Sequence, residues 1–252
     1  MRYITTLFFL LLTFQSFAQD YIFVPVAMRR EAAPLIASMD NADTLNISGF
    51  SIYRGQIDGR NVIAGVSGPG LINMSSMMSL VCSRYRVSTV INYGMVGGYG
   101  RNVHKLDLII GTECMNTGSY MSSRKRTGIN IRKWDFVTFT DGGNDELRLY
   151  KSDSALMAVA QDIKYPHTLH TGRVGSADIW CNERKMIRMM MRRYSIACED
   201  MEAVAVYQVA GRFGIPCITI KGVSDNCFLN EEYDDTVIAP MTEFVMELIK
   251  GI

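Results

Sequence analysis

The sequence lacks the patterns that mark most metal-binding and nucleic-acid-binding proteins. None of its six cysteines forms a CxxC pair, and no histidine lies at metal-ligand spacing from them, so we expect no zinc site. With 26 Lys and Arg against 25 Asp and Glu, the net charge is only +1, which gives no basic excess to attract nucleic acid. The glycine-rich turn at residues 67–70 matches neither the GxxxxGK[ST] nor the GxGxxG pattern. We therefore expect no metal, no organic cofactor and no nucleic-acid partner.

A membrane-spanning helix is also missing from the sequence pattern. The apolar run at residues 4–14 is shorter than the about 20 residues that a bilayer requires. It follows a basic start, Met1-Arg2, and precedes small residues that end at Ala18, which is typical of a secretory signal peptide. We expect residues 1–18 to be cleaved near Ala18, so that the mature chain is exported to the periplasm or secreted and stays outside the membrane. No Cys directly follows the run, so a lipid anchor is not indicated.

The cysteines have the character of small buried hydrophobes, because several lie within apolar segments. The six positions are Cys82, Cys114, Cys181, Cys198, Cys217 and Cys227. An oxidising compartment permits a disulfide, and Cys217 with Cys227 is one possible pair. The sequence leaves the pairing open.

What the chain does contain is the alternation of apolar runs and amphipathic segments that is typical of an α/β domain. At 252 residues and 48% hydrophobic content, we expect one domain over residues 19–252. Residues 21–26 and 87–93 have strand character, and residues 71–85 and 154–163 have helical character. Asp58-Gly59 between two apolar runs predicts a hairpin.

Residues 196–226 hold two carboxylates in positions that suggest a ligand site. Met201-Glu202 opens an amphipathic helix, and the apolar run after Pro216 leads to Ser224-Asp225. Glu202 therefore lies at a helix N-terminus and Asp225 at the C-terminal end of a strand. In open α/β sheets, those are the ends where ligands bind.

The same stretch resembles a known family. Asp200-Met201-Glu202-Ala203, followed by a helix, a strand and Ser224-Asp225, is similar to the purine nucleoside phosphorylase and nucleosidase superfamily. It most resembles the branch that contains 5'-methylthioadenosine/S-adenosylhomocysteine nucleosidase. The resemblance implies a single domain with a central mixed, twisted sheet flanked by helices, assembled as a homodimer or larger homo-oligomer. The apolar helix at residues 71–85 would supply the subunit contact. Residues 116–145 match the family poorly and are expected to form a variable loop.

The resemblance also implies catalytic roles for three carboxylates. Asp225 would protonate N7 of the leaving purine, Glu202 would bind the ribose hydroxyls and offset the positive charge on the sugar, and Glu31 would activate water. Hydrolysis of a glycosidic bond needs an acid and a base of this kind. The implied reaction cleaves the N-glycosidic bond of a purine nucleoside, of the 5'-methylthioadenosine or S-adenosylhomocysteine kind, and releases adenine and the free sugar.

Further residues match the family's substrate-binding positions. They are Ala27, Met28, Met95, Val96, Gly97, Ile179, Trp180, Met201, Lys221, Ser224 and Tyr233. Met95 replaces a serine of the family, and the aromatic that stacks on the base is displaced from position 179 to Trp180. Ser224 would orient Asp225, and the Lys221 cation would keep Asp225 ordered and bias its charge.

Two other functions fit the residues. A phosphate-dependent phosphorylase of the same superfamily would need an anion site, which Arg29, Arg30 or Arg54 could supply. Against it, Asn92 stands where related phosphorylases have a phosphate-binding arginine. A non-catalytic, exported nucleoside-binding protein is the second alternative, suggested by the departures at Met95 and position 179. A binding protein would have no need of Glu31.

Overall fold

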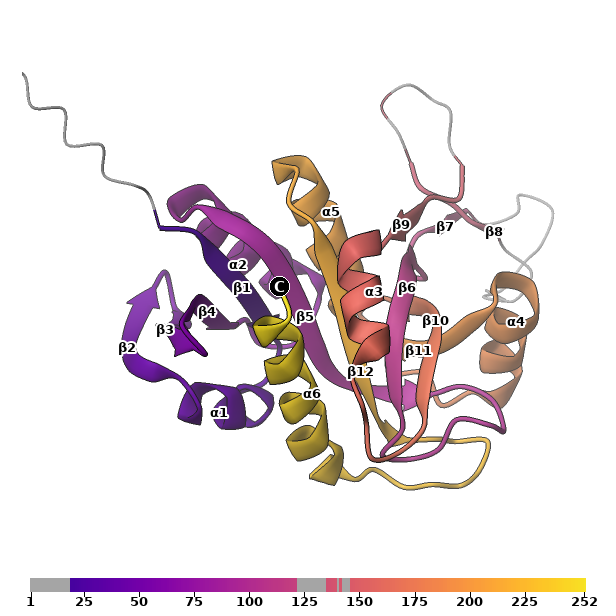
Figure 1. Ribbon diagram of the computed structural model, residues 1–252. Coiled ribbons are helices and arrows are strands. Elements are labelled where there is room, and N and C mark those ends of the chain that lie inside the picture. The colour runs from indigo at the N-terminus through magenta and orange to yellow at the C-terminus, as the bar shows by residue number, and fades with distance from the viewer. Residues whose placement is uncertain (1–18, 122–134, 140, 142–145) are drawn as a thin grey trace, which may run out of the picture.

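Figure 1 shows the computed structural model of the chain, which describes residues 19–121, 135–139, 141 and 146–252. The expected signal peptide, residues 1–18, lies outside the described residues, as does much of the expected variable loop. No helix within the described ranges is long and apolar enough to cross a membrane.

The described elements alternate between strands and helices, as the sequence pattern predicted. The strands are β1 (Tyr21–Val26), β2 (Asp40–Ile47), β3 (Phe50–Ile57), β4 (Arg60–Val66), β5 (Val87–Gly98), β6 (Leu108–Asn116), β7 (Tyr120–Met121), β8 (Asp135–Phe136), β9 (Leu149–Lys151), β10 (Leu169–Ser176), β11 (Ile196–Asp200) and β12 (Cys217–Asp225). The helices are α1 (Arg29–Ala37), α2 (Leu71–Arg84), α3 (Ser154–Asp162), α4 (Arg184–Tyr194), α5 (Ala203–Phe213), the short 3₁₀ helix η2 (Asp235–Val237) and α6 (Ile238–Lys250).

The central sheet is mixed, as expected for this fold class. Its strand order is β11-β10-β6-β12-β5-β1-β4-β3-β2, with β9 added beside β6. β5 runs parallel to both β1 and β12, whereas β12 and β6 are antiparallel. The predicted hairpin joins β3 to β4 through Asp58 and Gly59, whose φ angles are 50° and 74°, as a tight turn of this kind requires.

The sheet curls back on itself at the end that carries the cavity. The expected strand at residues 87–93 was too short, because β5 continues through the glycines to Gly98. There, Gly97 pairs with Glu199 and Gly98 with Cys198 of β11, which was not predicted as a strand. A side chain at Gly98 would lie only 2.8 Å from a methyl carbon of Val223, so the close approach of β5 and β12 requires glycine at this position.

Helices cover both faces of the sheet. In Figure 1, α3 and α6 lie in front of the central strands, and α2 and α5 lie behind them. Buried residues of α2 and α5, including Met77 and Val206, form one apolar core, and α1, α3 and α6 contribute Leu35, Leu156 and Phe244 to the other. α5 ends at Phe213, and the next residue, Gly214, takes a left-handed conformation with φ 67°. Glu202 and Asp225 are thereby fixed by two well-packed elements, α5 and β12.

The fold excludes a disulfide between Cys217 and Cys227, the possible pair named from the sequence. Cys217 opens β12, and Cys227 follows the end of the same strand. Ten residues of largely extended chain separate their Cα atoms by roughly 30 Å, whereas a disulfide requires less than about 7 Å. Both residues are free thiols.

Candidate active site

A cavity of about 320 Å³ opens where β1, β5, β11 and β12 end. Its wall contains the three carboxylates that the sequence singled out, Glu31, Glu202 and Asp225. The wall also holds Ala27, Met28, Arg30, Pro69, Met95, Val96, Gly97, Tyr99, Ile179, Trp180, Cys181, Glu199, Asp200, Met201, Ser224 and Tyr233. Residues from distant parts of the chain therefore meet at one site.

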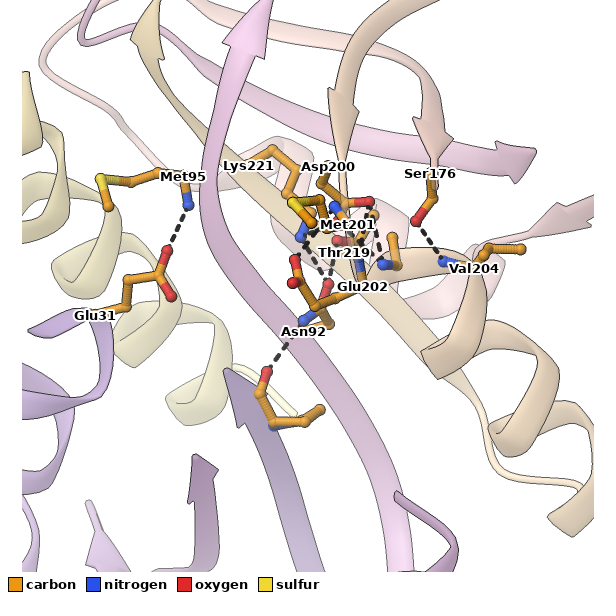
Figure 2. Close-up of polar contacts among 12 residues, drawn as sticks. Glu31, Asn92, Met95, Ser176, Asp200, Met201, Glu202, Val204, Thr219 and Lys221 are labelled. Carbon is orange, nitrogen blue, oxygen red and sulfur yellow. Dashed lines mark hydrogen bonds and ion pairs between the residues drawn. The ribbon is translucent and has the colours of Figure 1, made fainter. Parts of the chain in front are cut away.

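Glu31 is held by backbone donors on two sides. It lies in the first turn of α1, where its carboxylate accepts hydrogen bonds from the backbone N–H of Met28 at 3.0 Å and of Met95 at 2.9 Å. Only 2% of the residue is exposed, and burial raises the pKa of the carboxyl although both hydrogen bonds lower it. Gly94 passes close beneath, since a Cβ there would lie 3.1 Å from Glu31 Oε1. Figure 2 shows the contact between Glu31 and Met95.

Glu202 directly precedes α5 and reaches the turn before α2. Its Oε1 accepts a hydrogen bond of 2.8 Å from the backbone N–H of Gly70. Burial, reinforced by the negative charge of Asp200, raises the pKa of Glu202 to about 7, and the cation of Lys221 opposes this shift. The carboxyl can therefore exchange a proton near neutral pH.

Asp225 ends β12 at an irregularity in the strand. The pairing register with β5 shifts between Val223 and Asp225, so the side chain turns toward the cavity beside Gly97. Ser224 Oγ donates a hydrogen bond of 2.7 Å to Asp225 Oδ1. Burial raises the pKa of Asp225, and the Ser224 bond partly offsets the increase. A raised pKa suits an acid that must hold a proton before it acts.

Lys221 is the one predicted substrate-binding residue that the structure removes from the cavity wall. Its ammonium lies 2.7 Å from Asp200 Oδ2 and donates to Asn92 Oδ1 at 2.8 Å. Its charge acts on Asp200, Glu202 and Glu31, and the predicted support of Asp225 was wrong. The reason is the register shift before Asp225, which ends the regular alternation along β12.

The other predicted substrate-binding positions line the cavity. Trp180 is 68% exposed there, so it is no part of the apolar core, and Ile179 beside it is 37% exposed. Tyr233, from the loop after β12, donates its hydroxyl to the Met95 sulfur at 3.4 Å. These aromatic and aliphatic side chains form the outer rim, and the carboxylates lie deeper.

Several wall residues were not predicted from the sequence. They are Pro69, Tyr99, Cys181, Glu199 and Asp200. Glu199 and Asp200 could have been noticed, because with Glu202 they place three acids within four residues. Asp200 caps α5, accepting from the backbone N–H of Glu202 and Ala203. Tyr99 donates its hydroxyl to Glu199 at 2.7 Å, a contact between β11 and the residue that follows β5.

The arginines considered for a phosphate site are mostly engaged elsewhere. Arg54 forms an ion pair with Asp43, and Arg29 donates to Tyr53 and Ser51. Arg30 alone of the three lines the cavity, with its guanidinium 5.3 Å from the ring centre of Tyr233. In the described part of the chain, no group of three His, Cys, Asp or Glu side chains is arranged to hold a metal ion.

Comparison with known proteins identifies the superfamily to which the chain belongs. The sequence matches the family model described as phosphorylase superfamily over residues 21–249. It is similar to the 5'-methylthioadenosine/S-adenosylhomocysteine nucleosidase of Tolumonas auensis, with 26% identity over 205 residues that cover 79% of this chain and 83% of that protein. For the nucleosidase of the same name from Bacillus subtilis, identity is 24% over 235 residues, covering 90% and 96%. The crystal structure of the Neisseria meningitidis nucleosidase with methylthio-immucillin-A has a TM-score of 0.77 at 21% identity, covering 92% and 99%.

Proposed function

Because the chain belongs to the phosphorylase superfamily, we propose that it is a nucleosidase that hydrolyses the N-glycosidic bond of a purine nucleoside. The observation that carries this proposal is the convergence of Glu31, Glu202 and Asp225 on one cavity. The relatives named above are nucleosidases for 5'-methylthioadenosine and S-adenosylhomocysteine. We take a 5'-thio-substituted purine nucleoside as the substrate class, with the free base and free sugar as products.

The three carboxyl groups divide the work of hydrolysis. Asp225, with its raised pKa and its Ser224 contact, protonates N7 of the purine so that the base leaves neutral. Glu202 binds the sugar hydroxyls and, when ionised, stabilises the positive charge that develops on the ribose. Glu31 accepts a proton from the attacking water, which makes it the general base.

The position of Glu31 favours water over phosphate as the nucleophile. Its carboxylate already occupies the backbone N–H donors of Met28 and Met95, which a phosphate ion would otherwise use. A carboxylate at this place also repels an anion, whereas water can donate a hydrogen bond to it. Arg30 at the rim is paired with Asp235 at 3.8 Å, so its charge is partly neutralised.

The wall matches a nucleoside that carries an apolar substituent. Met28, Met95 and Met201 present thioether side chains, which adapt their shape to apolar groups. Ile179 and Trp180 add apolar surface at the rim.

A substrate panel on the chain from residue 19 tests the proposal. We expect release of free base from 5'-methylthioadenosine at the same rate with and without inorganic phosphate, and free sugar as the second product. Formation of a sugar 1-phosphate would instead identify a phosphorylase. Binding of the nucleoside without cleavage would identify a binding protein.

Two further features of the mature protein belong to this proposal. Export is supported by the basic start, apolar core and small residues at 1–18. Sequencing the N-terminus of protein recovered from cells tests cleavage near Ala18.

A homo-oligomer is supported by Ile72 of α2, which is 77% exposed beside a groove shared with Val204 and Val209 of α5. Light scattering of the wild type and of Ile72→Glu tests whether that face joins two copies.

A further inference from the structure

Glu199 is a buried acid in the cavity wall to which the reaction described above gives no role. The residue is only 9% exposed, and its carboxylate accepts hydrogen bonds from Tyr99 Oη at 2.7 Å and from Thr117 Oγ1 at 3.4 Å. Burial raises the pKa of Glu199 to about 7, and these two hydrogen bonds and a backbone hydrogen bond at Cys181 partly offset the increase. Burying a carboxylate costs free energy that an apolar residue would avoid. A buried acid in the wall of this cavity is therefore a candidate functional residue.

The sheet register places Glu199 opposite the acid that protonates the base. Gly97 of β5 pairs with Asp225 on one side and with Glu199 on the other, and all three residues line the cavity. The two acids thus belong to strands on either side of β5, with Cα atoms roughly 10 Å apart, or two strand spacings. With Asp225 at N7 of the purine, this strand order puts Glu199 on the opposite side of the base.

The neighbours of Glu199 fix its hydrogen-bonding character. A carboxylate has about four acceptor positions. Three of them are occupied by donors from Tyr99, Thr117 and the backbone at Cys181. The acceptor position that remains is suited to an N–H donor of a ligand. Adenine has an unprotonated nitrogen at N1, whereas a 6-oxopurine has an N–H at the same place.

We propose that Glu199 is a specificity-determining residue that accepts a hydrogen bond from N1–H of a 6-oxopurine, so that the site takes hypoxanthine-type nucleosides in addition to adenine nucleosides. The inference rests on the proposed function, since it places the purine between Asp225 and Glu199. It predicts a broader base range than the names of the related nucleosidases indicate.

The test compares two substrates that differ only in the base, 5'-methylthioadenosine and 5'-methylthioinosine. We expect the wild type to release base from both. Glu199→Gln keeps the size of the side chain but replaces one acceptor oxygen with an NH₂ donor. At a pH above about 8, where Glu199 with its pKa of about 7 is ionised, the ratio of kcat/KM for the 6-oxopurine substrate to that for the adenine substrate should fall about 10- to 100-fold, the loss expected for a hydrogen bond to a charged group.

A matched control and a binding measurement separate this inference from the reaction itself. Glu243→Gln changes an exposed acid of α6 outside the cavity and should leave the ratio unchanged. Calorimetry with free hypoxanthine and free adenine should show that Glu199→Gln weakens hypoxanthine selectively. The role of Glu199 is overturned if the wild type releases adenine but neither cleaves nor binds the 6-oxopurine. The proposed nucleosidase activity is retained in that case. The proposed reaction is overturned if the wild type cleaves neither substrate. If Glu199→Gln then still loses hypoxanthine binding selectively, the role of Glu199 is retained.

Discussion

Lys221 and Asp200 form an ion pair of 2.7 Å whose side chains are only 2% and 1% exposed. The pair joins β12 to the start of α5, because Asp200 also accepts from the backbone N–H of Ala203. Figure 2 shows the pair beside Glu202 and Asn92. Burial lowers the pKa of Lys221, but the charge and hydrogen bond of Asp200, together with the charges of Glu202 and Glu31, outweigh it, so the net pKa is raised and the lysine stays protonated. A cluster of carboxylates is thereby tolerated around one buried cation.

Removal of this cation should destabilise the fold strongly. Lys221→Met leaves the charge of Asp200 buried without a cation, and we expect the free energy of unfolding, measured by urea titration, to fall by about 3–5 kcal/mol. The double variant Lys221→Met with Asp200→Asn should recover most of that loss, because neither buried charge remains. Lys250→Met, which breaks an exposed pair with Glu247, is the control and should change stability by less than about 1 kcal/mol. A loss below about 1 kcal/mol for Lys221→Met would contradict this account.

Asp225→Asn should abolish most turnover because it cannot protonate the leaving base. We expect kcat to fall at least about 100-fold, the usual contribution of a general acid, with little change in melting temperature. Ser224→Ala should lower kcat less, since it removes only the orienting hydrogen bond. Asp162→Asn, at the end of α3, serves as the control. Normal turnover by purified Asp225→Asn would exclude Asp225 as the acid.

Gly94→Ala should impair the reaction by moving Glu31. The new methyl carbon would lie 3.1 Å from Glu31 Oε1, so the carboxylate must shift by a few tenths of an ångström or more. Because misplacement of a catalytic group by about 1 Å can cost about 100-fold, we expect kcat to drop about 10- to 100-fold. Gly211→Ala is a matched control, since no atom lies within 4 Å of its added carbon, and it should keep full activity. Equal activity of the two variants would show that Gly94 does not limit the position of Glu31.

The stability of the protein should depend on pH through Glu199. Burial raises the pKa of Glu199 to about 7, from an ordinary value of 4.5. Between these values the folded protein holds a proton that the unfolded chain has released, so the free energy of unfolding falls as pH rises from about 5 to 7. Glu202, with a pKa of about 7, contributes in the same direction.

Glu199→Gln removes one of these two contributions. The melting temperature of the wild type minus that of Glu199→Gln should therefore decrease from pH 5 to pH 8, in scans across this range. A difference that stays constant or increases with pH would contradict a raised pKa at Glu199.

The sequence by itself determined the carboxylates that local pattern can place. Glu202 precedes a helix because an amphipathic run follows it, and Asp225 ends a strand because the apolar run from Cys217 stops there. The family pattern added Glu31, and the structure brings all three to one cavity. The alternation of strands and helices indicated an α/β domain, and the family resemblance added that its central sheet is mixed.

Only the tertiary structure decided what surrounds those carboxylates. The family pattern assigned Lys221 to Asp225, yet the register shift between Val223 and Asp225 turns Asp225 toward the cavity, and the ammonium of Lys221 pairs with Asp200. Glu199 was missed because its strand, β11, becomes part of the site only where it pairs with Gly97 of β5. The sequence pattern indicates which face of a strand a side chain lies on. The cavity that this side chain faces depends on the neighbouring strands, and distant segments of the chain determine which strands those are.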